Sequence, residues 1–81
     1  MEDEDIQTSV FEFIKRRFPD IQLAPEDDIF SLGFVNSLFA MELVLFLENT
    51  FSFTIPNEAL RLDNFRSVKA MTQLVHQYAG S

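Results

Sequence analysis

Residues 37–51, SLFAMELVLFLENTF, constrain the fold most, because they hold more apolar side chains than one face of a helix can. On a wheel of about 100° per residue, one stripe can face a core. Its members are Ala40, Leu43, Val44, Leu47 and Phe51. Leu38, Met41 and Leu45 form a second arc, while Phe39 and Phe46 project on the other flank. One small core covers these faces only in part, so we expect a helix with an exposed apolar surface.

Two further segments have helical periodicity. The first contains Ile6, Val10, Phe13 and Ile14 and predicts a helix from about Asp5 to Arg17. Its acidic start and its basic end complement the helix dipole. The second follows Ser67, a plausible N-cap, and contains Val68, Met71, Leu74, Val75 and Tyr78. Together these patterns predict three main helices.

The connections differ in character. NEALRL, after Pro56, predicts one short helical turn, and LDNFRSV leads into the last helix. Residues 19–36 contain two prolines and a glycine without a sustained period, which predicts a long loop between the first two helices. Because this loop contains several apolar residues, we expect it to pack across the helices. These residues are Leu23, Ile29, Phe30, Leu32 and Phe34.

Length and composition complete the fold prediction. The 81 residues suffice for one domain, residues 1–81, and 47% of them are hydrophobic while only two are glycine. Few glycines disfavour tight hairpins. We therefore expect an all-α four-helix bundle with three main helices, one short helix and the long loop.

Composition also excludes several classes of function. The formal net charge of −7 opposes binding to nucleic acid, because phosphate backbones attract basic proteins. The chain has no cysteine, so it has no thiol nucleophile or disulfide. No apolar run approaches the roughly 20 residues of a membrane span, and MEDED does not resemble a secretory signal. We expect a cytoplasmic monomer without a membrane partner.

Candidates for metal binding and catalysis are weak. Glu26, Asp27 and Asp28 lack the alternating ligands and final glutamate of a calcium loop, and a short capping turn explains them better. His76 is expected at the surface. A hydrolase using Ser37 would need a nearby base, and no G-x-S-x-G elbow surrounds this serine. We therefore predict no catalytic and no metal-binding residues.

Ser37 opens the second helix, and the side chain of Asn36 can cap its first turn. Periodicity alone leaves two interpretations open. Ser37 shares the capping with Asn36, or it is a point of attachment beside an apolar surface on which an enzyme can dock.

Residues 28–56 contain a series of short elements in a fixed order: Leu32-Gly33, Asn36-Ser37-Leu38, Glu42-Leu43, Leu47-Glu48 and Phe51, followed by Ile55-Pro56. By these elements the segment resembles the acyl carrier protein family. The resemblance implies an acyl carrier domain without catalytic activity, in which Ser37 carries 4′-phosphopantetheine derived from coenzyme A. It also implies partner docking along the second helix. The expected docking residues are Asn36, Leu38, Phe39, Met41, Glu42, Leu45 and Glu48.

The implied partners are a phosphopantetheinyl transferase, acyl-loading and acyl-modifying enzymes, and a polyketide synthase acyltransferase or ketosynthase. The chain departs from the family at Asn36, where aspartate is usual, and at Phe39, where an acidic residue is frequent. Docking should therefore depend less on charge than in fatty-acid carriers.

The strings GFVNSLFAMELV and LDNFRSV are similar to free-standing carriers for glycerate-derived extender units, of hydroxymalonyl or methoxymalonyl type, in polyketide or hybrid polyketide-peptide secondary metabolism. Two alternatives remain open at this point. One is a peptidyl or aminoacyl carrier, and the other is a helical protein-interaction module in which Ser37 is only a cap.

Overall fold

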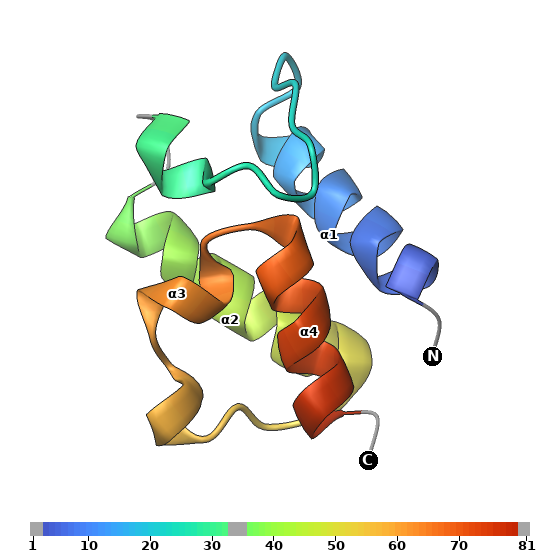
Figure 1. Cartoon of the computed structure of the whole chain (residues 1–81), viewed down its shortest axis with the longest axis vertical. Coiled ribbons are helices and arrows are strands. Elements are labelled where there is room, and N and C mark those ends of the chain that lie inside the picture. The colour runs from blue at the N-terminus through green and yellow to red at the C-terminus, as the bar shows by residue number, and fades with distance from the viewer. Residues whose placement is uncertain (1–2, 33–35, 80–81) are drawn as a thin grey trace.

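The computed structural model describes residues 3–32 and 36–79, which form a helical bundle (Figure 1). Its main helices are α1 (Asp3–Arg17), α2 (Ser37–Phe51) and α4 (Val68–Tyr78), and α3 (Leu62–Phe65) is short. Two 3₁₀ turns, Ile29–Leu32 and Asn57–Ala59, lie in the connections. The predicted all-α class, with three main helices and one short helix, is confirmed.

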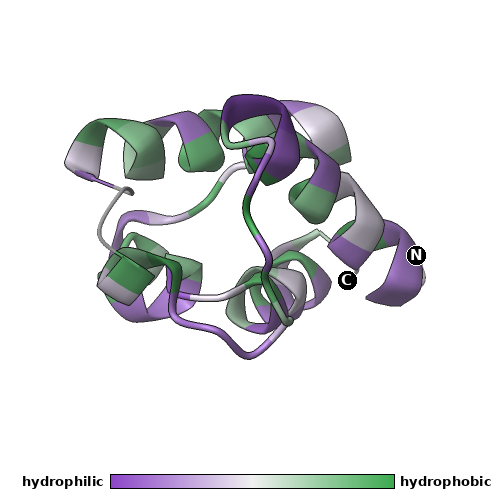
Figure 2. Cartoon of the chain, turned by 90° about the horizontal axis from the view of Figure 1, so that it is seen from above, coloured by the Kyte–Doolittle hydropathy of each residue, from purple (hydrophilic) through white to green (hydrophobic). Residues whose placement is uncertain are grey.

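The predicted periodicities identify most of the core. Ile6, Val10 and Ile14 of α1 are fully buried, as are Leu43 and Leu47 of α2. The buried face of α4 contains the predicted apolar residues Val68, Met71, Leu74 and Val75. Figure 2 shows hydrophobic and hydrophilic residues sharing each main helix, the pattern of amphipathic helices around one core.

The buried face of α2 differs from the predicted one, because it includes Phe39, which the sequence pattern placed on a flank of the helix. Phe39 is only 2% exposed, whereas Ala40, Val44 and Phe51 are intermediate. The Phe39 ring lies 5.7 Å from the ring of Phe13 and 5.1 Å from that of Phe18, at the end of α1. Phe13 also stacks on Phe46 at 4.3 Å. This aromatic cluster rotates the buried face of α2 toward α1, because aromatic rings bury the largest areas.

The long loop is fixed to the other end of the chain. The amide of Ile29 donates to the carbonyl of Arg66 at 2.7 Å, and the amide of Lys69 donates to the carbonyl of Pro25 at 2.8 Å. Ile29 is fully buried, and Leu23 and Phe30 pack against the core, as predicted. Leu32 is 42% exposed, so its expected packing is wrong, and Phe34 lies outside the described residues.

Two local predictions have different outcomes. The carboxylates of Asp27 and Asp28 accept hydrogen bonds from the amides of Ala24 and Phe30, as a capping turn requires. The short helix does not cover NEALRL. Only residues 57–59 form a 3₁₀ turn there, and α3 begins at Leu62, where Phe65 can bury its ring at 3% exposure.

We predict that Leu47→Ala destabilises the bundle by about 2–5 kcal/mol, because a fully buried leucine leaves a cavity when truncated. Met41→Ala, at a side chain 66% exposed, should change the free energy of unfolding by about 0.5 kcal/mol or less. Urea unfolding followed by circular dichroism measures both. A loss in Met41→Ala as large as that in Leu47→Ala would place Met41 in the core and contradict this packing.

Candidate functional site: the start of helix α2 and the groove beside it

The cap of α2 presents Ser37 to solvent. The side-chain oxygen of Asn36 accepts a hydrogen bond from the amide of Phe39 at 3.0 Å, so the predicted N-cap is confirmed. Ser37 is the first residue of the helix and is exposed. Because Asn36 does the capping, the hydroxyl of Ser37 is left without a hydrogen bond among the described residues. Residues 33–35 of the predicted motif lie outside the described residues.

The second arc of α2 is exposed, as its spacing predicted. Leu38, Met41 and Leu45 are 65%, 66% and 57% exposed. Apolar side chains of this size stabilise a fold when they are buried, and in these positions that free energy is not gained. The three residues follow one another along the helix from the turn that contains Ser37. An enzyme that reaches Ser37 can therefore cover these apolar side chains.

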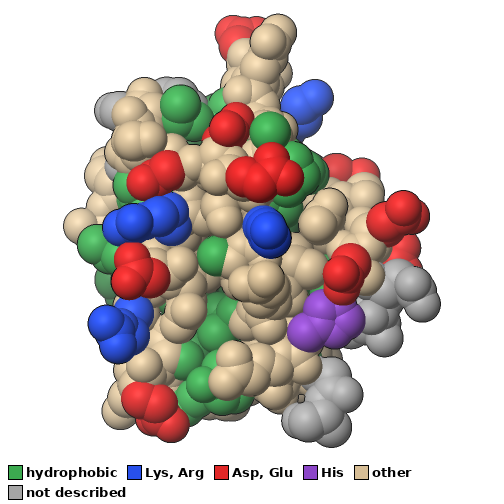
Figure 3. Space-filling view, in the orientation of Figure 1, with side chains coloured by type: hydrophobic (Ala, Val, Ile, Leu, Met, Phe, Trp, Pro, Cys, Tyr) green, Lys and Arg blue, Asp and Glu red, His purple; other side chains and the backbone are tan. Residues whose placement is uncertain are grey.

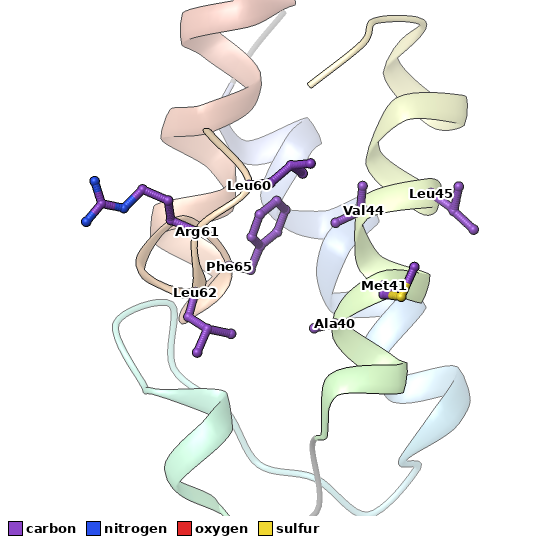
Figure 4. Close-up of a pocket in the computed structure, with 8 residues that line it drawn as sticks. All are labelled: Ala40, Met41, Val44, Leu45, Leu60, Arg61, Leu62 and Phe65. Carbon is purple, nitrogen blue, oxygen red and sulfur yellow. The ribbon is translucent and has the colours of Figure 1, made fainter. Parts of the chain in front are cut away.

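A groove of about 290 Å³ continues this apolar surface toward the next segment of the chain. Its α2 side contains Ala40, Met41, Val44 and Leu45, and its other side contains Leu60, Arg61, Leu62 and Phe65. Figure 4 shows Leu60 and Phe65 pointing toward α2, while the guanidinium of Arg61 extends away from the groove. The interior is therefore apolar. Leu60 and Leu62, exposed at 45% and 61%, were not predicted as site residues, because no periodic pattern includes them.

The two carboxylates of α2 are both engaged within the chain. Arg17, at the end of α1, donates from one Nη atom to both oxygens of Glu42, at 2.8 and 2.9 Å. Glu48 accepts the backbone amide of Ile55 at 2.8 Å. The pairing of Arg17 with Glu42 was not predictable from local patterns, because the two residues are 25 positions apart. Figure 3 shows acidic and basic side chains interspersed over one face, with apolar side chains exposed between them.

The structure corrects the expected docking set at Phe39. Its ring is buried between Phe13 and Phe18 and lies under Arg17, whose guanidinium carbon is 5.8 Å from the ring centre. Phe39 therefore packs in the core between α1 and α2 and does not belong to the exposed surface of α2. Asn36 and Glu48 have the intramolecular bonds described above, and only Leu38, Met41 and Leu45 of the set are more than half exposed apolar residues.

His76 does not support a hydrolytic site. It is exposed, as predicted, and its Nε2 pairs with the carboxylate of Asp3 at the start of α1. Figure 1 shows the start of α2 and the end of α4 on opposite sides of the bundle. The histidine is therefore not positioned to take a proton from Ser37, which a serine nucleophile would require.

Residues 3–32 and 36–79 contain no group of three His, Asp or Glu side chains arranged to hold a metal ion. Within the same ranges, no helix has the length and hydrophobicity to cross a bilayer.

Comparison with known proteins gives the class of the molecule. Residues 4–75 match the family model described as "Phosphopantetheine attachment site". The D-alanyl carrier proteins of Streptococcus pyogenes serotypes M5 (strain Manfredo) and M1 are each 30% identical to this chain over 73 residues, which cover 89% of this chain and 92% of each relative. No solved structure gives a significant match.

The fold and the match over residues 4–75 define a carrier protein rather than an enzyme. The chain belongs to the phosphopantetheine attachment site family. Its cofactor is 4′-phosphopantetheine, which is attached covalently, and its partners include a phosphopantetheinyl transferase and acyl-handling enzymes.

Proposed function

We propose that the chain carries acyl intermediates as thioesters on a 4′-phosphopantetheine arm attached to Ser37. The observation that carries this proposal is that Ser37 is exposed at the first position of α2, where Asn36 caps the helix and the Ser37 hydroxyl has no hydrogen bond to residues 3–32 or 36–79. An anion at this end of a helix is favoured by the first-turn amides and by the helix dipole. A phosphodiester on Ser37 fits that environment.

The chemical step of attachment needs no reacting group of this chain except the accessible hydroxyl of Ser37. The Ser37 oxygen forms a bond to the phosphorus that bears pantetheine, the P–O bond within the pyrophosphate of coenzyme A breaks, and the adenosine bisphosphate leaves. The serine proton passes to a base, which the transferase supplies, since His76 is in the last turn of α4 and the end of α4 lies on the opposite side of the bundle from the start of α2 (Figure 1). The arm ends in a thiol, a group that the cysteine-free chain lacks.

We also propose that the docking surface for successive enzymes is formed by Leu38, Met41 and Leu45. Their exposure of more than half supports this role, because an apolar surface of this kind is stabilised when a partner covers it. The groove between α2 and α3 adjoins Met41 and Leu45 and offers an apolar surface to the arm or to its cargo.

The cargo has two candidates. An aminoacyl group is favoured by the relatives named D-alanyl carrier protein, at 30% identity. A glycerate-derived extender unit of a polyketide pathway is favoured by the strings GFVNSLFAMELV and LDNFRSV. The cytoplasmic location, the monomeric state and the polyketide synthase partners stay predictions.

We predict that incubation with coenzyme A and a broad-specificity phosphopantetheinyl transferase adds one phosphopantetheine group to the chain, and that Ser37→Ala abolishes the gain. Ser31→Ala is the matched control, because Ser31 is also exposed and lies shortly before α2. Intact-protein mass spectrometry measures all three. A folded wild-type chain without the added mass would contradict the carrier role and favour the interaction module.

We predict that Met41→Ala and Leu45→Ala each lower kcat/KM of that modification by about tenfold, if each side chain contributes the ~1.4 kcal/mol of a substantial interface contact. The fold should be retained, because both side chains are exposed and alanine favours helix. Gln73→Ala, at an exposed position of α4, is the control. Unchanged kinetics in both variants would show that this face is not the docking surface.

We predict that the pantetheinylated protein accepts one cargo class selectively. An ATP-dependent D-alanine ligase and a glycerate-loading enzyme are offered separately, and the acyl mass on the arm is measured. Loading by the ligase alone would support an aminoacyl carrier, whereas loading by the second enzyme alone would support the extender-unit carrier. If a malonyl transferase acylates the arm readily and neither of the two enzymes does, both candidates are wrong.

A further inference from the structure

Arg17 forms an ion pair with Glu42, the carboxylate on α2 that a basic partner would otherwise contact. Of the two acidic residues in this helix, Glu42 follows Met41 in the chain and borders the exposed arc on the side that faces Arg17 of α1. Both of its oxygens accept hydrogen bonds from Arg17, at 2.8 and 2.9 Å. The guanidinium also lies over the buried Phe39 ring, at 5.8 Å. Two interactions therefore hold Arg17 against this side of α2.

The pair is exposed enough to open. The side chains of Arg17 and Glu42 are 50% and 36% exposed, so water and salt screen their attraction. A lysine or arginine of a partner that pairs with Glu42 must compete with Arg17, so one ion pair is exchanged for another. The ion pair with Arg17 therefore lowers the binding free energy that a cationic contact with Glu42 can add. It leaves the apolar contacts of Leu38, Met41 and Leu45 unchanged.

We infer that Arg17 is a specificity-determining residue, which masks Glu42 so that α2 accepts apolar docking surfaces and discriminates against partners that depend on a basic contact. This inference rests on the proposed docking of enzymes on α2. The partner it selects against presents lysine or arginine side chains beside an apolar patch. Selection of this kind is achieved by removing an attraction for the wrong partner, not by adding one for the right partner.

The test uses the apo protein, coenzyme A and a phosphopantetheinyl transferase whose active-site entrance has a basic rim. Arg17→Gln uncovers Glu42 and should raise kcat/KM at low salt by about 1.5- to fivefold, the range expected for an exposed ion pair. The gain should vanish near 1 M NaCl, where the Debye length is about 3 Å. Adding Glu42→Gln to Arg17→Gln should also remove it.

Arg16→Gln is the matched control, because it makes the same change in net charge one residue earlier on α1 and leaves the bonds of Arg17 to Glu42 in place. A gain in Arg17→Gln beyond that in Arg16→Gln, lost in the double variant, supports the inference. Equal rates in the two single variants would overturn it while the carrier function stands. No modification of any variant, including the wild type, would overturn the proposed function itself.

Discussion

The fold depends on which side of α2 is buried. This helix is apolar on several faces, and the aromatic contacts of Phe39 and Phe46 with α1 fix its rotation about its own axis. Leu43 and Leu47 then face the core, and Leu38, Met41 and Leu45 face solvent. A rotation that buried the second arc would expose the phenylalanines instead, whose area is larger. The exposed surface therefore follows from the aromatic packing.

The start of α2 combines two roles in two neighbouring residues. Asn36 satisfies the helix end, so Ser37 is released from capping and remains accessible. The apolar arc begins one residue later, at Leu38, and the groove against Leu60, Leu62 and Phe65 begins within the next turn. Attachment, docking and contact with the arm are thus proposed for one continuous surface, and the chain needs no catalytic group of its own for any of them.

Local signals in the sequence predicted much of this arrangement. The bounds of α2, the caps at Asn36 and Ser67, and the exposure of the second arc depend on residues within a turn or two of each other. Contacts between distant segments were not predictable in the same way. The burial of Phe39 depends on where Phe13 and Phe18 lie, and the position of α3 depends on burying Phe65. The pair of Arg17 with Glu42 is likewise set by the approach of α1 to α2.

The central claim is that the hydroxyl of Ser37 bears the arm. The most direct measurement is localisation of the added group in the wild-type protein after modification. Cleavage after Glu26 and Glu42 gives a peptide, residues 27–42, that contains both Ser31 and Ser37. Fragmentation of this peptide by tandem mass spectrometry should assign phosphopantetheine to Ser37 alone. Assignment to Ser31, or to a peptide without Ser37, would contradict the account.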